Sequence, residues 1–179
     1  MELLIMIDMQ NDFTTGVLGN KRTAAVTANV CRELDKYKKS GLPLIYTMDT
    51  HGDDYMDTQE GKNLPVPHCI EGTDGWELPS AIKDAVSDMS TIMIKKNTFG
   101  AKELPKEVGT LLSIYPTITE VKFIGVCTDI CVISNAMLLK AFFPELKITV
   151  KKTCCAGVTP ESEENALRAM KSCQITVEE

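Results

Sequence analysis

The chain is organised around residues 121–136, VKFIGVCTDICVISNA, which pass from strand character to helix character. The first six residues form a largely apolar run of strand type, in which Gly125 permits a sharp turn of the backbone. Thr128 and Asp129 are good N-cap residues, and from Cys131 onward apolar residues recur at helical spacing. This stretch therefore predicts a strand, a tight turn and a helix with Cys131 in its first turn.

The predicted place of Cys131 has a chemical consequence. A helix N-terminus presents unpaired N–H groups and the positive end of the helix dipole, and both favour a thiolate. The same N–H groups can receive the oxyanion of a tetrahedral intermediate. Cys131 is therefore a candidate nucleophile. The competing interpretation is an inert buried cysteine, which is common in protein cores and is the better one for this stretch taken alone.

Length and composition are those of one ordinary globular domain, residues 1–179, with 44% hydrophobic and 25% charged residues. The net charge of -6 does not favour binding to nucleic acid or to an anionic membrane surface. No apolar run is long enough to span a bilayer. The N-terminal MELLIMIDMQ leads into a strand and does not resemble a signal peptide. The seven cysteines lack zinc-type spacing and are explained most simply as reduced thiols, so we expect a cytoplasmic protein.

Strand-type and helix-type segments alternate along the chain. The predicted strands are 3–7, 43–48, 91–94, 121–126, 147–150 and 175–177, and the predicted helices are 23–40, 80–87, 102–114, 129–143 and 159–172. The alternation predicts a single-domain α/β fold with a doubly wound (Rossmann-like), mostly parallel six-stranded sheet and helices on both faces. Residues 50–79 have no clear period but hold both histidines and the only tryptophan, so we expect a functional loop there.

Chemically useful residues follow the predicted strands where each strand ends. The first strand ends at Asp8, and the second ends at Asp49, which His51 follows. The third ends near Lys96, and the fourth leads to Cys131. Ligands of open parallel sheets bind at the carboxyl ends of the strands. The topology thus gathers an acid, possible metal ligands, a cation and a thiol at one edge, which core packing does not explain.

Five short motifs run in order through most of the chain: 7–13 IDMQNDF, 49–51 DTH, 67–73 PHCIEGT, 96–99 KNTF and 125–132 GVCTDICV. Together they resemble the isochorismatase-like cysteine hydrolases, and most closely the nicotinamidase (pyrazinamidase) branch. The resemblance implies a hydrolase acting on a non-peptide C–N bond, which would convert nicotinamide and water to nicotinate and ammonia as a step of NAD metabolism.

The resemblance places a catalytic triad on Asp8, Lys96 and Cys131. Cys131 would attack the amide carbonyl and form an acyl-enzyme, while Asp8 would take the thiol proton and later pass it to the leaving amine. Lys96 would hold this pair together, and it is preferred to Lys95 because the family's lysine stands three residues before an aromatic. A cis peptide bond is implied just before Cys127, so that the backbone N–H groups of Cys127 and Cys131 form the oxyanion hole.

A divalent metal is also implied by the resemblance, with zinc expected first and iron or manganese as alternatives. The implied ligands are an Asp-x-His pair and a later histidine, namely Asp49, His51 and His68. The fourth ligand, His or Glu in relatives, is expected to be Glu60, with Asp57 or Asp54 as the rival.

The substrate pocket is expected to include Phe13 and Phe99, although a core role for Phe99 is equally open. Some nicotinamidases place a tryptophan three residues before the metal-binding histidine, where it stacks on the pyridine ring, and here that position is Pro65. Trp76 could approach the ring from the loop or cap the core, and we favour the core. The weakened aromatic clamp leaves the identity of the small-molecule amide open.

Other functions compete with the nicotinamidase interpretation. The nearest is a related cysteine hydrolase acting on another small amide, or an isochorismatase-type hydrolase; true isochorismatases lack the metal, which argues against the latter. A non-catalytic binding member is disfavoured by the intact triad, and a redox role by the absence of CxxC spacing. By analogy with relatives, we expect a homo-oligomer, either a dimer or a tetramer.

Overall fold

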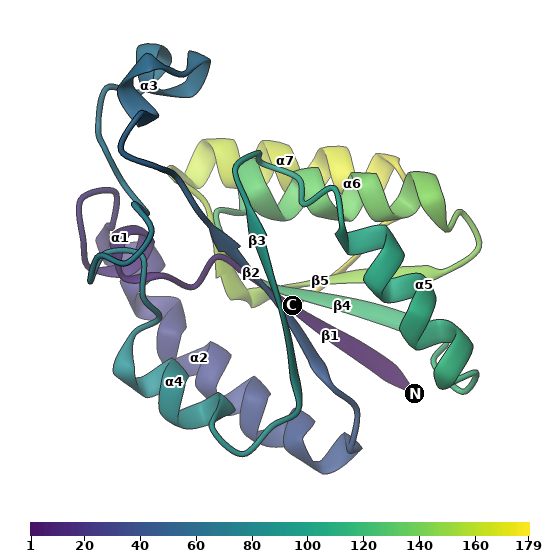
Figure 1. Cartoon of the computed structure of the whole chain (residues 1–179). Coiled ribbons are helices and arrows are strands. Elements are labelled where there is room, and N and C mark those ends of the chain that lie inside the picture. Colours follow the sequence, from purple (N-terminus) through teal and green to yellow (C-terminus); the bar gives the residue numbers. More distant parts are fainter.

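The computed structural model describes residues 1–179 and shows a twisted sheet between two layers of helices (Figure 1). The strands are β1 (Glu2–Ile7), β2 (Leu44–Asp49), β3 (Thr91–Lys96), β4 (Glu120–Val126), β5 (Lys147–Ala156) and β6 (Thr176–Glu178). Their order is β3-β2-β1-β4-β5-β6, and all neighbouring strands pair in parallel. The predicted doubly wound fold is confirmed, and the sheet is wholly parallel.

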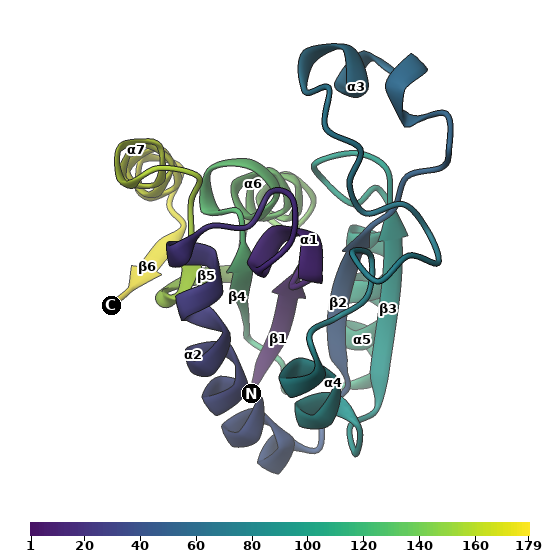
Figure 2. The same ribbon diagram turned by 90° about the vertical axis from the view of Figure 1, so that its left-hand side faces the viewer.

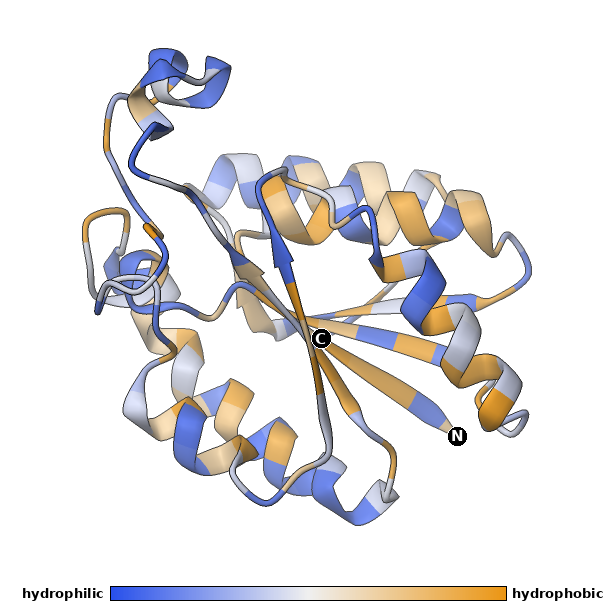
Figure 3. Ribbon diagram, viewed as in Figure 1, coloured by the Kyte–Doolittle hydropathy of each residue, from blue (hydrophilic) through white to orange (hydrophobic).

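The helices are α1 (Asn11–Thr14), α2 (Lys21–Tyr37), α3 (Gln59–Asn63), α4 (Ser80–Val86), α5 (Leu104–Ile114), α6 (Ile133–Phe142) and α7 (Pro160–Ser172). Helices α2 and α4 cover one face of the sheet, and α5, α6 and α7 cover the other (Figures 1 and 2). In Figure 3 the central strands are mostly hydrophobic, whereas α2 alternates hydrophilic and hydrophobic residues. None of the helices combines the length and the apolar character that crossing a membrane requires.

The core is centred on β1, whose side chains from Leu3 to Ile7 are at most 1% exposed. A strand of a parallel sheet is covered on both faces, which is why its sequence is a continuous apolar run without alternation. Because the chain proceeds from β1 to β2 and β3 on one side and returns to β4 on the other, the strand order reverses between β1 and β4. The residues that follow these two strands therefore lie at the crevice where doubly wound folds bind ligands.

The turn after β4 differs from its prediction. Thr128–Val132 forms a π-helical turn, so Cys131 precedes α6 and does not lie in the first turn of an α-helix. The extra residue per turn arises because the N–H of Val132 donates to the carbonyl of Cys127, five residues earlier. Neither predicted cap forms; Asp129 instead accepts a bond of 3.1 Å from the N–H of Val158.

Two further segments differ most from what the sequence predicts. Strand β5 continues to Ala156 and not only to residue 150, because its end pairs with the end of β4 after a register shift that the polar residues 151–153 conceal in the sequence. The predicted loop 50–79 contains a 3₁₀ turn at Tyr55–Asp57 and helix α3. Residues 52–67, which we call the lobe, project above the carboxyl edge of the sheet (Figures 1 and 2). A parallel bridge between His51 and Ile70 closes the base of the lobe.

Candidate active site and metal centre

A cavity of about 960 Å³ opens at the carboxyl edge of the sheet, between the lobe and the turn after β4. This volume is near the upper end of the range found for small-molecule sites, roughly 300–1,000 Å³. The predicted site residues that line it are Phe13, Asp49, His51, Glu60, His68, Phe99, Cys127 and Cys131. The two others, Asp8 and Lys96, are buried and are not among the lining residues.

Asp8, Lys96 and Cys131 come together at the cavity although they follow three different strands. The Nζ atom of Lys96 lies 2.7 Å from Oδ2 of Asp8 and 3.6 Å from Sγ of Cys131. Thr47 of β2 donates from its hydroxyl to Oδ1 of Asp8 at 2.6 Å. Lys95, the neighbour that was not preferred, is exposed and pairs with Glu71. Of the two lysines, only Lys96 lies beside Asp8 and Cys131.

Burial controls the protonation of these groups. It raises the pKa of Asp8, and the positive charge of Lys96 only partly opposes this effect. Burial and the charge of Asp8 raise the pKa of the Cys131 thiol well above its ordinary value. The pKa of Lys96 is raised despite burial, because Asp8 and Asp49 lie beside it. Burial and the charge of Asp8 thus disfavour a thiolate at Cys131, while the ammonium of Lys96 favours it.

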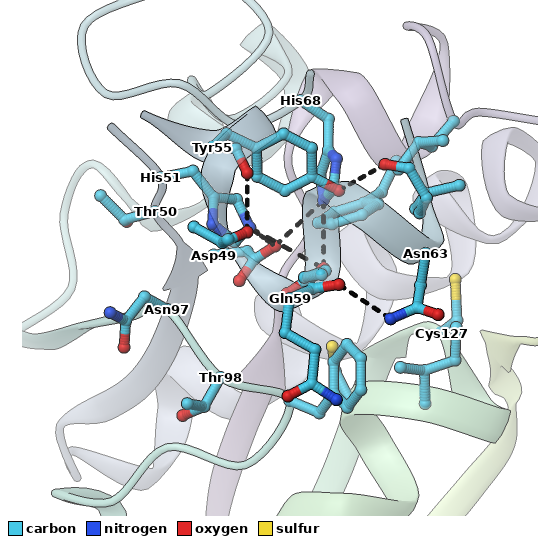
Figure 4. A pocket seen from close by; sticks show the side chains of 18 of the residues that line it. Asp49, Thr50, His51, Tyr55, Gln59, Asn63, His68, Asn97, Thr98 and Cys127 are labelled. Atoms are coloured by element: carbon cyan, nitrogen blue, oxygen red, sulfur yellow. Dashed lines mark hydrogen bonds and ion pairs between the residues drawn. The ribbon is translucent and has the colours of Figure 1, made fainter. Parts of the chain in front are cut away.

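A second cluster faces the same cavity from the end of β2, from the lobe and from the residues directly on either side of the lobe (Figure 4). Oδ2 of Asp49 lies 3.1 Å from Nε2 of His51 and 3.5 Å from Nε2 of His68. Oε1 of Glu60, from α3, lies 4.0 Å and 3.8 Å from the same two nitrogens. One ligand atom from each of the four residues lies within 4.8 Å of the other three. Of the three acids considered for the fourth position, Glu60 is thus the one within this cluster.

The chemistry of this donor set fits a divalent cation. The carbonyl of Val66 lies 2.9 Å from Nδ1 of His68 and can only accept, so Nδ1 carries the proton and the Nε2 lone pair faces the cluster. Burial disfavours a charged imidazole, yet the bond to Asp49 and the charge of Glu60 raise the pKa of His68 above its ordinary value. The cluster thus attracts positive charge. Two imidazoles and two carboxylates are suitable ligands for zinc, iron or manganese.

The aromatic residues divide between the cavity and the core. The ring of Phe13 meets the ring of His68 edge-on with centroids 5.6 Å apart. Phe99 is 51% exposed and lines the cavity, so a core role is ruled out. Trp76 does not line the cavity; it packs against the core, and its Nε1 donates to the hydroxyl of Thr50. Pro65 is exposed in the lobe and does not line the cavity either.

Several supporting residues were not singled out from the sequence. The side chain of Gln10 holds the backbone of Asp49 from both sides: Nε2 donates to its carbonyl at 2.8 Å, and Oε1 accepts from its N–H at 2.7 Å. The ring centroid of Tyr55 lies 4.8 Å from that of His51 and 5.0 Å from that of His68. Gln10 lies inside the motif 7–13 and could have been considered, whereas Tyr55 lies in a stretch without any periodic signal.

The peptide bond between Val126 and Cys127 is cis, as the resemblance implied. Asp12 supports the metal cluster from behind, because its Oδ2 accepts from the N–H of Cys69, the residue after His68, at 2.8 Å. The segment that carries His68 is therefore held through its backbone by a side chain of the motif 7–13.

Comparison with known proteins agrees with this picture. The family model described as the isochorismatase domain matches residues 2–179. A nicotinamidase/pyrazinamidase of Mycobacterium tuberculosis (strain ATCC 25618 / H37Rv) is 27% identical over 186 residues, which cover 98% of this chain and 97% of that protein. The crystal structure of a nicotinamidase from Bacillus subtilis is 26% identical, covers 99% of each chain and superposes with a TM-score of 0.84.

A pyrazinamidase of Pyrococcus horikoshii, solved in complex with zinc, has a TM-score of 0.78 over 98% of this chain and 97% of that one. At 24% identity it demonstrates a common fold only. The resemblance inferred from five short motifs is nevertheless confirmed, because the family model spans almost the whole sequence. The chain belongs to the isochorismatase family.

Proposed function

We propose that this protein is a cysteine amidohydrolase, and that nicotinamide is its substrate. The observation that supports the proposal best is that one cavity is lined by both the Cys131 thiol and the four-residue metal cluster, with Asp8 and Lys96 packed beneath. The likeness over nearly full length to nicotinamidases of Mycobacterium tuberculosis and Bacillus subtilis supports the same reaction.

In the first half of the proposed reaction, the Cys131 sulfur attacks the amide carbonyl carbon while the thiol proton passes to Asp8. Burial raises the pKa of Asp8 and so increases its affinity for a proton, although it raises the pKa of the thiol as well; the Lys96 ammonium beside both groups stabilises the sulfur anion that the transfer forms. Asp8 then gives the proton to the departing nitrogen, and ammonia leaves as the C–N bond breaks. The product of this half is a thioester on Cys131.

In the second half, a water molecule attacks the thioester carbon and transfers a proton to Asp8. The C–S bond breaks, Asp8 returns the proton to the sulfur, and the carboxylic acid leaves. Lys96 remains charged throughout and offsets the negative charge that moves between Asp8 and Cys131, since its Nζ lies near both. In both halves the backbone N–H groups of Cys127 and Cys131 hold the oxyanion.

The metal would be held by Asp49, His51, Glu60 and His68. When bound, a divalent ion supplies a Lewis-acidic centre that can hold the ring nitrogen of a pyridine amide. On the protein side, Phe13 packs its ring edge-on against His68 and forms part of the wall for a planar ring. In this arrangement the amide group of the substrate lies at the Cys131 thiol and its ring lies at the metal cluster.

A second candidate is hydrolysis of another small amide by the same mechanism. It is favoured by the position of Pro65 outside the cavity and by the cavity volume of about 960 Å³, since neither indicates a tight aromatic clamp on a single ring. The reaction chemistry is the same in both candidates.

The test is ammonia release from nicotinamide by the purified protein under reducing conditions. Parallel samples are Cys131→Ala, metal-stripped protein, and Cys173→Ala, an exposed cysteine as the matched control. Release that is lost in Cys131→Ala, reduced by metal removal and unchanged in Cys173→Ala is the expected result. Without release from metal-loaded wild type, nicotinamide is not the substrate. Equal release by Cys131→Ala would refute the mechanism.

A further inference from the structure

Helix α6 carries a fully buried amide directly behind the nucleophile. Asn135 is 0% exposed and lies four residues after Cys131. A buried amide is costly unless its donors and acceptor are all used, so its partners indicate what it holds. All three of its hydrogen bonds go to the backbone near the candidate active site.

The three bonds join two separate segments. Oδ1 of Asn135 accepts from the N–H of Ala101 at 2.8 Å, and Nδ2 donates to the carbonyl of Phe99 at 3.1 Å. Nδ2 also donates to the carbonyl of Cys131 at 2.8 Å. Ala101 and Phe99 belong to the loop 97–101, which follows Lys96 at the end of β3 and contributes Asn97, Thr98 and Phe99 to the cavity wall. One side chain thus binds the loop after the lysine and the turn of the nucleophile.

No other hydrogen bond joins the loop 97–101 to α6 or to the turn before it. The bond from the hydroxyl of Thr98 goes to Gly100 inside the loop, and the N–H of Leu104 returns to Ala101. Gly100 also packs against α6, because a Cβ atom built there would lie at an ordinary van der Waals distance, 3.6 Å, from the carbonyl oxygen of Ser134. All hydrogen bonds that fix the loop 97–101 relative to α6 and the turn before it therefore come from Asn135.

We propose that Asn135 is a positioning residue that keeps the loop after Lys96 registered against the turn of Cys131, and so holds the ammonium and the thiol together. The inference rests on the proposed function for its role in turnover, but the arrangement is independent of which amide is hydrolysed. Asn135 acts through the backbone of Cys131 and of the loop. Small displacements of reacting groups are expensive, on the order of 100-fold in rate for about 1 Å.

The test compares two variants with a control of similar burial. Asn135→Leu keeps the number and branching of the side-chain heavy atoms and removes all three bonds, while Asn135→Asp keeps the acceptor for Ala101 but sets a carboxylate oxygen against two carbonyl oxygens. The control is Thr149→Val, which removes a buried hydroxyl bonded to Glu120 at 2.6 Å on β5, outside the cavity lining. All samples are metal-loaded, and folding is checked by circular dichroism and thermal unfolding.

The first readout is the rate at which iodoacetamide alkylates Cys131, followed by mass spectrometry that separates Cys131 from Cys127. The expected result is slower alkylation in both Asn135 variants, approaching that of Lys96→Met, because the thiolate loses its nearby cation. The second readout is turnover of nicotinamide, with kcat about 10- to 100-fold lower and KM within about 3-fold of wild type.

Alkylation of Cys131 at the rate of Thr149→Val would overturn the proposal whatever happens to turnover, and so would a raised KM with unchanged kcat. If Asn135→Leu does not fold, Asn135→Asp decides by the same criteria. If the wild type hydrolyses no nicotinamide, the proposed function is refuted. The alkylation experiment still decides the role of Asn135, because it requires no substrate.

Discussion

The Nζ atom of Lys96 lies 3.1 Å from Oδ1 of Asp49, the same carboxylate whose other oxygen faces the two histidines of the metal cluster. The lysine beside the thiol and the candidate metal ligands therefore share one carboxylate. A change of charge at Lys96 therefore affects the candidate metal ligands through Asp49, and a change of charge at the ligands affects Lys96. This coupling connects the first two predictions.

Lys96→Met is expected to destabilise the fold as well as abolish turnover. It leaves Asp8 and Asp49 buried without their common cation, and removal of one partner from a buried ion pair costs about 3–5 kcal/mol. Urea unfolding measures the loss. Lys95→Met, which removes an exposed lysine paired with Glu71, should change the free energy of unfolding by less than about 1 kcal/mol. Similar losses in the two variants would contradict the assigned role of Lys96.

Glu60→Ala is expected to weaken zinc binding more than Asp54→Ala does. Both acids line the cavity, but only Glu60 has its oxygen within the four-residue cluster. A bound metal stabilises the fold by RT ln(1 + [L]/Kd), about 2.7 kcal/mol at 100 times Kd, so the thermal shift on adding zinc reports affinity. The shift should shrink in Glu60→Ala and stay as in wild type in Asp54→Ala. The reverse ranking would move the fourth ligand to Asp54.

Thr47→Val is expected to move the acid limb of the kcat/KM profile to higher pH. Burial already raises the pKa of Asp8, while the hydroxyl of Thr47 lowers it by donating to the ionised form at 2.6 Å. Without this bond the pKa of Asp8 rises further, and a base that must be ionised then becomes active only at higher pH. The shift should be about one pH unit, the equivalent of one hydrogen bond to a charged group. An unmoved limb would show that Asp8 is not the titrating base.

Glu33→Gln should lower stability at neutral pH but not in acid. Burial would raise the pKa of Glu33, but bonds from Lys151 at 3.1 Å and Lys36 at 3.3 Å lower it below its ordinary value. A lowered pKa in the folded state stabilises the protein above the unfolded pKa of about 4.3, and this contribution is lost as pH falls through the folded value. The deficit of the variant should be about 1 kcal/mol at pH 7, because water screens part of these ion pairs, and should shrink as the pH falls below about 4.

Urea unfolding at a series of pH values measures the effect of Glu33→Gln. Glu103→Gln, at an exposed acid without an ion pair, serves as the control and should follow wild type throughout. A deficit in Glu33→Gln that stays constant between pH 7 and pH 3 would mean that packing, and not charge, accounts for it.

The strand ends and the residues after them could be predicted from the sequence for a physical reason. Buried parallel strands are apolar throughout, so Asp8 and Asp49 mark the points where the apolar runs stop. Parallel topology then places all such points at one edge. The candidate metal ligands Glu60 and His68 could be predicted mainly through the resemblance, since both lie in the segment 50–79, which shows no periodic pattern.

The remaining features depend on tertiary contacts. In the sequence, Thr47 looks like any β-branched residue of a strand, and only the fold places its hydroxyl beside Asp8. Asn135 resembles a poorly helical surface residue, and only the fold places it under the loop after Lys96. The π-helical turn at Thr128–Val132 begins with Thr128 and Asp129, residue types that favour the start of an α-helix, so local preference could not separate the two although neither residue caps the turn.

Strand β1 pairs with β4 in a register that joins Glu2 to Glu120 and Ile7 to Gly125. Contacts so distant along the chain form slowly, because the long intervening segment must first be closed into a loop. During synthesis on the ribosome, one edge of the most buried strand therefore stays open until residue 126 has emerged. Asp8 and Cys131 come from opposite sides of this pairing, so the acid and the thiol meet only late in assembly. In a nascent or truncated chain Cys131 is an ordinary cysteine, and its place beside Lys96 and Asp8 is a property of the finished fold.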